Sequence, residues 1–158
     1  MADQTELKRD LWKRMAQSPF LMVGLPGEHS EPLTAQLDED QVDTLYFFTG
    51  KTNRLAKGGA AMAQFVSKGH DYFACLAGQV QLDNDPAMID KLWSSHVEAW
   101  FPGGKSDPNL ALLRFDIDDA ELWESDVSIT GKLKMLFGGT IKSDETGSHA
   151  VVGTTAES

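Results

Sequence analysis

An aromatic run leads into a hydroxyl, a glycine and several bases in Leu45-Tyr46-Phe47-Phe48-Thr49-Gly50-Lys51-Thr52-Asn53-Arg54-Leu55-Ala56-Lys57. Its first four residues have the aromatic and aliphatic character of a buried strand, which the following hydroxyl and glycine bring to an end. Asn53 is placed to cap a short helix. Free N–H groups at a helix start attract phosphate, and Lys51, Arg54 and Lys57 add positive charge nearby. The stretch therefore predicts a small anion site, although a turn followed by a solvated helix face fits the same residues.

The composition is typical of one globular domain. The chain has 158 residues, of which 41% are hydrophobic and 24% charged, and no apolar run approaches the roughly 18 residues of a membrane span. The first residues lack the basic and apolar regions of a signal peptide, which predicts a cytoplasmic protein that does not bind membranes. A net charge of −10 argues against nucleic acid as a partner. The single cysteine, Cys75, excludes an internal disulfide, and its alternating surroundings predict a packed core residue.

Hydrophobic periodicity predicts an α+β fold whose strands are mostly antiparallel. Strands are expected at residues 20–25, 29–37, 45–48, 60–67, 72–82, 110–117 and 120–124. Helices are expected at residues 3–17, after Asn53, at residues 83–100 and at residues 129–137. The third helix would carry Trp93 and Trp100 on one buried face. Short connections favour a barrel with helices outside it.

The domain is expected to span residues 1–137. From Gly138 onward the chain is rich in glycine, serine and threonine and has few large apolar groups. Such a composition buries little apolar surface, so residues 138–158 are expected to form a poorly ordered tail.

Several common chemistries have no motif in this chain. Gly-x-Gly-x-x-Gly and Walker-type signatures are absent, so a Rossmann or P-loop fold has no support. The four histidines lack the spacing of metal ligands, which argues against a zinc site. No nucleophile and base stand in a recognisable pair, which argues against hydrolysis and acyl transfer.

Four segments resemble a known family. They are Phe47-Phe48-Thr49-Gly50-Lys51, Phe65-Val66-Ser67-Lys68-Gly69-His70-Asp71, Ala99-Trp100-Phe101-Pro102-Gly103-Gly104-Lys105-Ser106-Asp107-Pro108 and Leu112-Leu113-Arg114-Phe115. Together with the order of elements, they resemble the general stress protein branch of the pyridoxamine 5′-phosphate oxidase-like, FMN-binding split-barrel superfamily, over roughly residues 5 to 137. The resemblance implies a six-stranded antiparallel split β-barrel with flanking helices. It also implies a homodimer that holds one FMN in each of two clefts between the subunits.

The resemblance also implies which residues bind the cofactor. Three consecutive residues of the second strand would lie along the isoalloxazine edge, a second group would hold the phosphate, and two aromatic residues would cover the flavin. These groups are Thr34, Ala35 and Gln36 for the ring edge, Thr49, Lys51, Thr52 and Asn53 for the phosphate, and Trp100 and Phe101 for the cover. Glu31 and Leu55 stand where many relatives carry bases, so Lys51, Arg54 or Lys57 would have to supply the missing charge.

Three hypotheses about function follow from the resemblance. The first is a cytoplasmic FMN flavoprotein that exchanges electrons with a small-molecule redox partner, the chemistry residing in the flavin. The second is a stress protein that binds or senses flavin without turnover. The third is a split barrel that has lost FMN or exchanged it for another cofactor, which the missing bases at Glu31 and Leu55 keep open.

Overall fold

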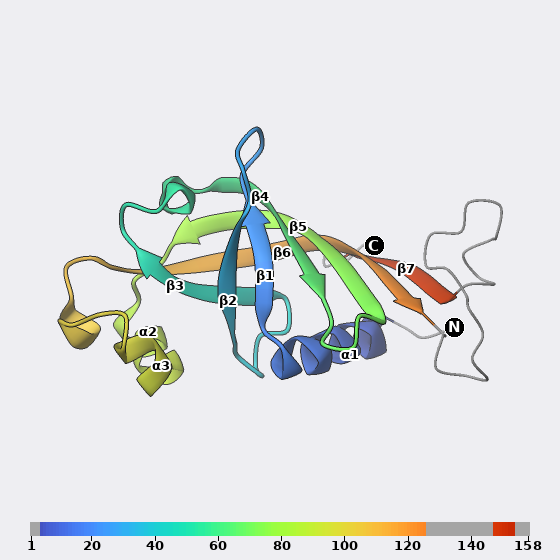
Figure 1. The fold of residues 1–158 in the computed structure, drawn as a ribbon, viewed down its shortest axis with the longest axis horizontal. Helices are drawn as coiled ribbons and strands as arrows, with labels where there is room; N and C mark the ends of the chain where they lie inside the picture. The colour runs from blue at the N-terminus through green and yellow to red at the C-terminus, as the bar shows by residue number, and fades with distance from the viewer. Residues whose placement is uncertain (1–3, 126–146, 154–158) are drawn as a thin grey trace.

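One antiparallel sheet of seven strands closes on itself through the pairing of β3 with β6. The computed structural model describes residues 4–125 and 147–153. Its strand order is β3-β2-β1-β4-β5-β6-β7, and the additional β3–β6 pairing makes β1 to β6 a closed barrel with β7 outside it (Figure 1). The strands are β1 Phe20–Gly24, β2 Glu31–Leu37, β3 Thr44–Gly50, β4 Gly59–Val66, β5 Tyr72–Leu82, β6 Leu110–Ser125 and β7 Gly147–Gly153. The six-stranded antiparallel barrel expected from the sequence is confirmed.

Short helices cover the ends of the barrel. The helices are α1 Gln4–Gln17, α2 Pro86–Leu92 and α3 Ser95–Glu98, with 3₁₀ turns at η1 Arg54–Lys57 and η2 Gly104–Ser106. Figure 1 shows α1 along the lower side of the barrel and α2 with α3 beside β3, far from β7. The apolar stripe predicted for α1 is confirmed, because Leu11, Trp12 and Met15 are buried. None of the helices in the described part of the chain is long and apolar enough to cross a membrane.

Two clusters of buried side chains lie on opposite faces of β3. Leu45 and Phe47 point into the barrel and pack in the main core. Tyr46 points outward into a second cluster with Val97 of α3 and Phe101, and Phe48 packs against this cluster. Alternate residues of a strand face opposite sides of the sheet, so the continuous apolar run of β3 reflects burial on both faces. The outer cluster fixes the α2–α3 segment against the barrel.

Strand β6 is longer than the sequence suggested. The two strands expected at residues 110–117 and 120–124 form one strand of 16 residues. Its first half pairs with β3 and it also pairs with β5 along most of its length, with a register shift at Ala77/Gly78. A β-carbon on Gly78 would clash with the carbonyl oxygen of Asp116. The backbones of β5 and β6 therefore approach each other closely at this glycine.

Three expectations differ from the structure. The helix expected at residues 83–100 is broken at Trp93, whose backbone is extended, and Ser94 caps the new helix α3. Trp93 packs edge-on against Phe48 with ring centroids 5.7 Å apart, whereas Trp100 is 81% exposed. The two tryptophans therefore do not share a buried face. Cys75 is only half-buried and alternates with core residues on the outer side of β5.

The C-terminal segment also differs from the expectation. Within the expected tail, Gly147–Gly153 forms β7 and pairs antiparallel with β6 between Asp119 and Ser125. The open edge of β6 explains this, because its unpaired backbone groups accept another strand whatever the composition of that strand. The helix expected at residues 129–137 lies outside the described residues.

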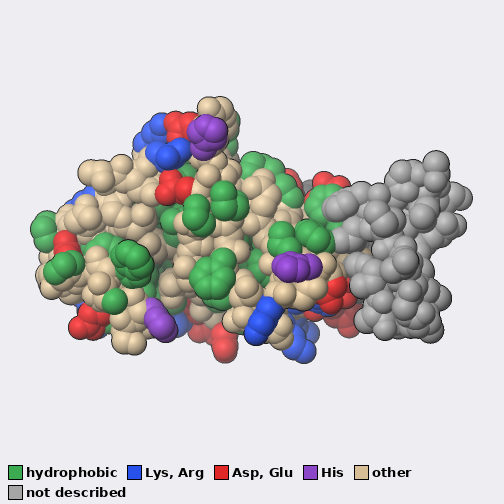
Figure 2. Space-filling view, in the orientation of Figure 1, with side chains coloured by type: hydrophobic (Ala, Val, Ile, Leu, Met, Phe, Trp, Pro, Cys, Tyr) green, Lys and Arg blue, Asp and Glu red, His purple; other side chains and the backbone are tan. Residues whose placement is uncertain are grey.

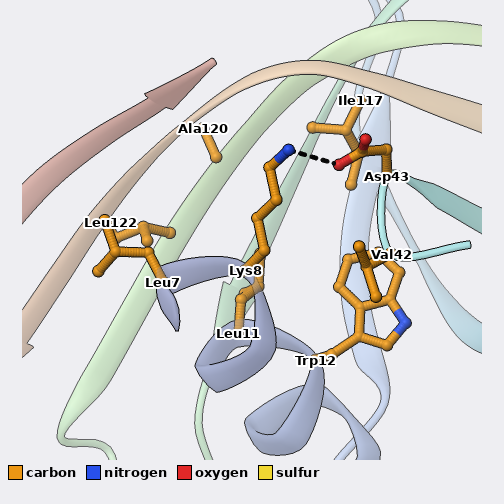
Figure 3. Close-up of a pocket in the computed structure, with 9 residues that line it drawn as sticks. All are labelled: Leu7, Lys8, Leu11, Trp12, Val42, Asp43, Ile117, Ala120 and Leu122. Atoms are coloured by element: carbon orange, nitrogen blue, oxygen red, sulfur yellow. Dashed lines mark ion pairs between the residues drawn. The ribbon is translucent and has the colours of Figure 1, made fainter. Parts of the chain in front are cut away.

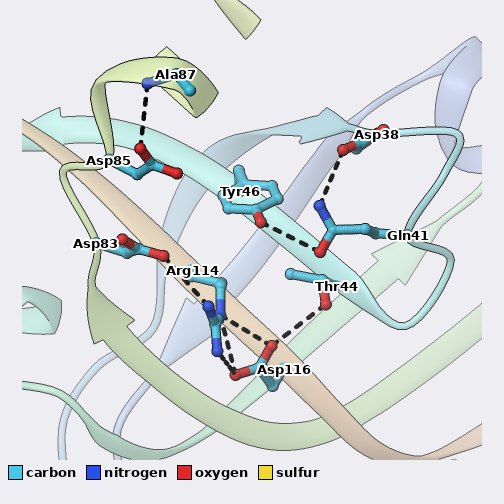
Figure 4. A network of polar contacts seen from close by, with 9 residues as sticks. All are labelled: Asp38, Gln41, Thr44, Tyr46, Asp83, Asp85, Ala87, Arg114 and Asp116. Carbon is cyan, nitrogen blue, oxygen red and sulfur yellow. Dashed lines mark hydrogen bonds and ion pairs between the residues drawn. The ribbon is translucent and has the colours of Figure 1, made fainter. Parts of the chain in front are cut away.

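A buried aspartate joins α2 to the loop between β2 and β3. The Asp38 carboxylate accepts hydrogen bonds from the backbone N–H of Asp40 at 3.0 Å and from the Gln41 amide at 2.9 Å (Figure 4). Lys91 of α2 lies 3.0 Å from the same carboxylate. Burial alone would raise the pKa of Asp38, but these donors outweigh it and hold that pKa below its ordinary value. The ionised carboxylate thus helps to position the segment that carries α3.

A second polar network ties β6 to the strands beside it. Arg114 lies 3.1 Å from Asp116 on the same strand and 3.3 Å from Asp83, which leads into α2. Asp116 also accepts a hydrogen bond of 3.2 Å from the Thr44 hydroxyl at the start of β3 (Figure 4). The neighbouring carboxylates raise the pKa of the Arg114 guanidinium, and the hydrogen bonds to Asp116 have the largest effect. The arginine of the Leu-Leu-Arg segment therefore has a structural role in this fold.

We expect Gly78→Ala to destabilise the barrel. The added methyl group meets the backbone of β6 rather than a flexible side chain, and overpacking of this kind costs about 3 kcal/mol. The free energy of unfolding from urea denaturation measures the effect. Gln79→Ala, at the exposed neighbouring position, is the matched control and should change stability by less than about 0.5 kcal/mol. Equal stability of Gly78→Ala and the wild type would contradict the close approach of β5 and β6.

We expect Asp38→Asn to lower the free energy of unfolding by about 1–3 kcal/mol at pH 7, because charge-assisted hydrogen bonds are lost. The depressed pKa means that the ionised carboxylate stabilises the fold above about pH 4 and that this stability is lost as the pH falls through the folded-state pKa. The difference between variant and wild type should therefore shrink below pH 4 in thermal unfolding. Asp40→Asn, whose exposed carboxylate also lies near Lys91, should have little effect. A difference independent of pH would contradict this role.

Candidate functional site

A cleft of about 480 Å³ opens between β2, the end of β3 and the segment around α3. Its volume is within the range of small-molecule and cofactor sites. The lining residues are Pro32, Leu33, Thr34, Gln36, Phe48, Thr49, Gly50, His96, Val97, Trp100, Phe101 and Asn109. Five of the nine cofactor-binding residues expected from the sequence are among them: Thr34, Gln36, Thr49, Trp100 and Phe101. The structure thus brings residues from three distant segments to one cleft.

Strand alternation decides which residues of β2 reach the cleft. Thr34 and Gln36 point outward and line it, whereas Ala35 is 4% exposed and packs in the barrel core. The backbone N–H of Ala35 donates to the carbonyl oxygen of Pro19 at 2.7 Å. Ala35 therefore lies beside the site, but its side chain and its N–H group are both already engaged elsewhere.

Aromatic residues form one wall of the cleft. Phe101 is 6% exposed and belongs to the outer cluster, whereas Trp100 is 81% exposed at the cleft. Hydrogen bonds from the N–H of Trp100 to Val97 and from the N–H of Phe101 to Glu98 continue the helical turn beyond α3. This turn places His96 and Trp100 four residues apart on the same side. The wall therefore combines a firmly packed ring with one that presents its surface to a ligand.

An aspartate fixes the loop that follows the aromatic wall. Asp107 accepts hydrogen bonds from the backbone N–H groups of Asn109 at 2.8 Å and Gly103 at 2.9 Å. These two donors hold the pKa of Asp107 below its ordinary value, and the N–H of Asn109 has the larger effect. The Asn109 carbonyl in turn accepts from the N–H of Lys51 at 2.9 Å. The shape of this loop thus follows from its own sequence, and the loop links Trp100 and Phe101 to the end of β3.

The lining of the cleft is nearly free of charge. Among the described residues that line it there is no lysine, arginine, aspartate or glutamate, and His96 is the one histidine. No histidine was among the site residues expected from the sequence, so His96 is an addition to them. The four-residue spacing between His96 and Trp100 was the available signal, but it pointed to the cleft only once the helix break at Trp93 was known. A neutral cleft with polar edges suits a flat, uncharged ring.

Lys51 lies next to the cleft rather than in it. With Asn84, Asp90, Lys105 and Asp107, it lines a neighbouring hollow of about 410 Å³. Lys105 is paired with Asp90 at 3.0 Å. No ion pair or hydrogen bond of the Lys51 ammonium group is present among residues 4–125 and 147–153. Since Gly50 lines the cleft, Lys51 stands at the border between the two hollows with its charge available.

The turn after β3 uses most of its polar groups internally. The expected cap is present, because Asn53 accepts a hydrogen bond from the N–H of Leu55 at 2.7 Å at the start of η1. The N–H groups of Asn53 and Ala56 also have backbone acceptors. Thr52 is exposed and does not line the cleft. The start of η1 therefore offers an incoming anion fewer free donors than the sequence suggested.

A second cavity under α1 is too small for a cofactor. Leu7, Lys8, Leu11 and Trp12 of α1 face Asp43 and the apolar residues of β6 across it, and Lys8 lies 3.1 Å from Asp43 (Figure 3). Its volume is about 10 Å³, which is at most the space of one water molecule. This cavity is a packing gap between α1 and the barrel. In the part of the chain that the structure describes, no cluster of three or more histidine, cysteine, aspartate or glutamate residues is arranged to hold a metal ion.

Solved structures of general stress proteins resemble this fold. The chain is 42% identical to the general stress FMN/FAD binding protein from Xanthomonas citri, with a TM-score of 0.74, covering 85% of this chain and 99% of that one. It is 25% identical to a general stress protein 26 from Jannaschia sp. CCS1, with a TM-score of 0.78, covering 96% of this chain and 99% of that one.

Sequence comparison gives the same family. General stress protein 26 of Bacillus subtilis (strain 168) is 40% identical over 52 residues, which are 33% of this chain and 36% of that protein. The match thus spans about a third of the length of this curated relative. The family model described as pyridoxamine 5′-phosphate oxidase like matches residues 6–149. The barrel, the cleft beside it and a family match over most of the sequence together lead to one conclusion: the chain belongs to the pyridoxamine 5′-phosphate oxidase-like family, among its general stress proteins.

Proposed function

We propose that the cleft binds FMN without a covalent bond. The observation that carries this proposal is the uncharged cleft itself, where an aromatic wall faces the polar side chains of β2 and β3. A flat isoalloxazine ring has apolar faces and a polar edge, so it requires that combination of surfaces. The name of the Xanthomonas citri relative, a general stress FMN/FAD binding protein, supports a flavin.

The residues present fit both ends of such a ligand. Thr34, Gln36 and Thr49 supply hydroxyl and amide groups that can donate to ring carbonyls or accept from ring nitrogens. Trp100 and Phe101 would cover the ring and exclude water. Lys51, unpaired among the described residues and adjacent to the cleft, is our choice for the main phosphate contact. The bound flavin would supply the electron-transfer chemistry, while the protein positions it.

We further propose that the protein is a homodimer whose second copy closes the cleft. Phe20 is 62% exposed, Met22 43%, Met62 41% and Val66 44%. The register places Met22 opposite Pro32 and Phe20 opposite Thr34, and both of these β2 residues line the cleft. In Figure 2, apolar side chains gather over this part of the sheet. An apolar patch of this kind on a strand face is typical of a protein interface, and a partner seated here would reach the cleft.

Two activities are compatible with a flavin in this cleft. In the first, a cytoplasmic flavoprotein exchanges electrons with a small molecule that enters beside Trp100. In the second, the protein binds or senses flavin without turnover. His96 supports the first, because it lines the cleft and its imidazole can donate a hydrogen bond to a bound molecule or accept one from it. Sustained oxidation of a reduced nicotinamide by the flavin-loaded protein distinguishes the two.

We expect the purified protein to bind FMN and Lys51→Ala to weaken that binding about tenfold, because a charge-assisted contact to phosphate is lost. Quenching of flavin fluorescence during titration measures the dissociation constant. Lys68→Ala removes a lysine that is also exposed, from the turn between β4 and β5, and is the matched control, with an unchanged affinity expected. Equal affinities of the two variants would remove Lys51 from the site, and failure of the wild type to bind FMN would refute the proposed function.

We expect Met22→Glu to dissociate the proposed dimer, since it places a charge in the centre of the apolar patch and a buried unpaired charge is costly. Sedimentation velocity measures the oligomeric state. Leu82→Glu is the matched control because Leu82 is exposed to the same degree, 44%, at the end of β5 away from the patch. A monomeric wild type, or a dimer that survives Met22→Glu, would contradict the proposed interface.

A further inference from the structure

A carboxylate occupies the turn that follows β3. The Glu31 side chain is 24% exposed, and it accepts a hydrogen bond of 2.8 Å from the Asn53 amide. Its second oxygen lies 3.2 Å from Nε of Arg54. Arg54 also donates to the carbonyl oxygen of His29 at 3.2 Å. Glu31 therefore holds both the amide and the guanidinium group that this turn could offer to an anion.

This carboxylate borders the cleft. Glu31 directly precedes Pro32 on β2, and the N–H of Asn53 donates to the carbonyl oxygen of Gly50 at 2.9 Å. Pro32 and Gly50 both line the cleft. The Glu31–Asn53–Arg54 cluster thus lies at the end of the cleft nearest Lys51, which is the end proposed above for the charged tail of the ligand.

The bases of the turn are unequally available. Arg54 is paired with Glu31, and Lys57 lies 2.5 Å from Glu28. Lys51 alone among the three has no ion pair within the described residues. A carboxylate about 3 Å from a guanidinium group cancels most of the attraction that the guanidinium group would exert on an approaching phosphate. The carboxylate also repels the phosphate directly. The turn therefore presents one net positive charge where its sequence suggests three.

We propose that Glu31 is a specificity-determining residue, which competes with the anionic tail of the ligand for Arg54 and Asn53. The inference rests on the proposed flavin site and adds a specific consequence to it. The cleft binds the ring through shape and apolar contact, and Glu31 limits how much a tail phosphate adds to affinity. The protein consequently discriminates less between flavins with charged tails and flavins with uncharged tails. Its discrimination would be greater if Lys51, Arg54 and Lys57 were all free to bind the phosphate.

The test compares FMN with riboflavin, which carries the same ring and an uncharged tail. Glu31→Gln removes the negative charge and keeps an amide oxygen that can still accept from Asn53. We expect this variant to bind FMN about five- to thirtyfold more tightly than the wild type and to bind riboflavin within about twofold of it. Glu39→Gln, which removes the same charge from an exposed position in the loop at the other end of β2, is the matched control and should leave both affinities within about twofold. Thermal unfolding verifies that each variant is folded.

The dependence of FMN affinity on salt gives a second readout that needs no riboflavin binding. With Glu31 neutralised, more positive charge faces the phosphate, so the fall of affinity with increasing salt should be steeper in Glu31→Gln than in the wild type. Unchanged or weaker FMN binding by Glu31→Gln with an unchanged salt dependence would overturn the inference and leave the flavin site standing. Equal gains for FMN and riboflavin would also overturn it. Failure of both flavins to bind the wild type and the variant would refute the proposed function, and the inference with it.

Discussion

The pairing of β3 with β6 is the constraint on which the structure depends. It runs from Thr44 opposite Asp116 to Gly50 opposite Leu110, and it closes six strands into a barrel. Closure buries the inner face of β3 in the core and turns its outer face towards α3. It also brings Lys51 beside Asn109, whose carbonyl its N–H contacts. The cleft exists because the end of this pair, β2 and the aromatic turn after α3 meet there.

Charge is distributed around the cleft rather than inside it. The chain carries a net charge of −10, yet no carboxylate, lysine or arginine is among the described residues that line the cleft. Around it, Glu31 neutralises Arg54, Glu28 neutralises Lys57 and Asp90 neutralises Lys105. A ring would therefore be recognised through shape, stacking and a few hydrogen bonds, whereas its tail would meet a small number of charges. In such a site a single unpaired lysine or one neutralising glutamate has a large effect on the affinity for the charged tail, because few other charges contribute.

The sequence predicted local structure well and distant contacts poorly. The strand at residues 72–82, the amphipathic helix at the N-terminus and the Asn53 cap depend on neighbouring residues, and all three are present. The break at Trp93 depends on packing against Phe48, 45 residues earlier in the chain. The pairing of Arg54 with Glu31 likewise joins segments far apart in sequence. Periodicity carries no information about such partners. The sequence therefore identified five residues that line the cleft, out of nine expected, but it did not show that Arg54 and Lys57 are paired with carboxylates.

In the proposed function, the cleft beside β2 receives the flavin ring, and no other part of the described chain does. A titration of the ¹⁵N-labelled protein with FMN, followed through its backbone amide resonances, tests this most directly. We expect the resonances of residues 33–36, 48–51 and 96–101 to shift, while those of residues 7–12 and 42–43 beside the small gap under α1 do not. Shifts confined to the region of that gap, or an unchanged spectrum at saturating FMN, would contradict it.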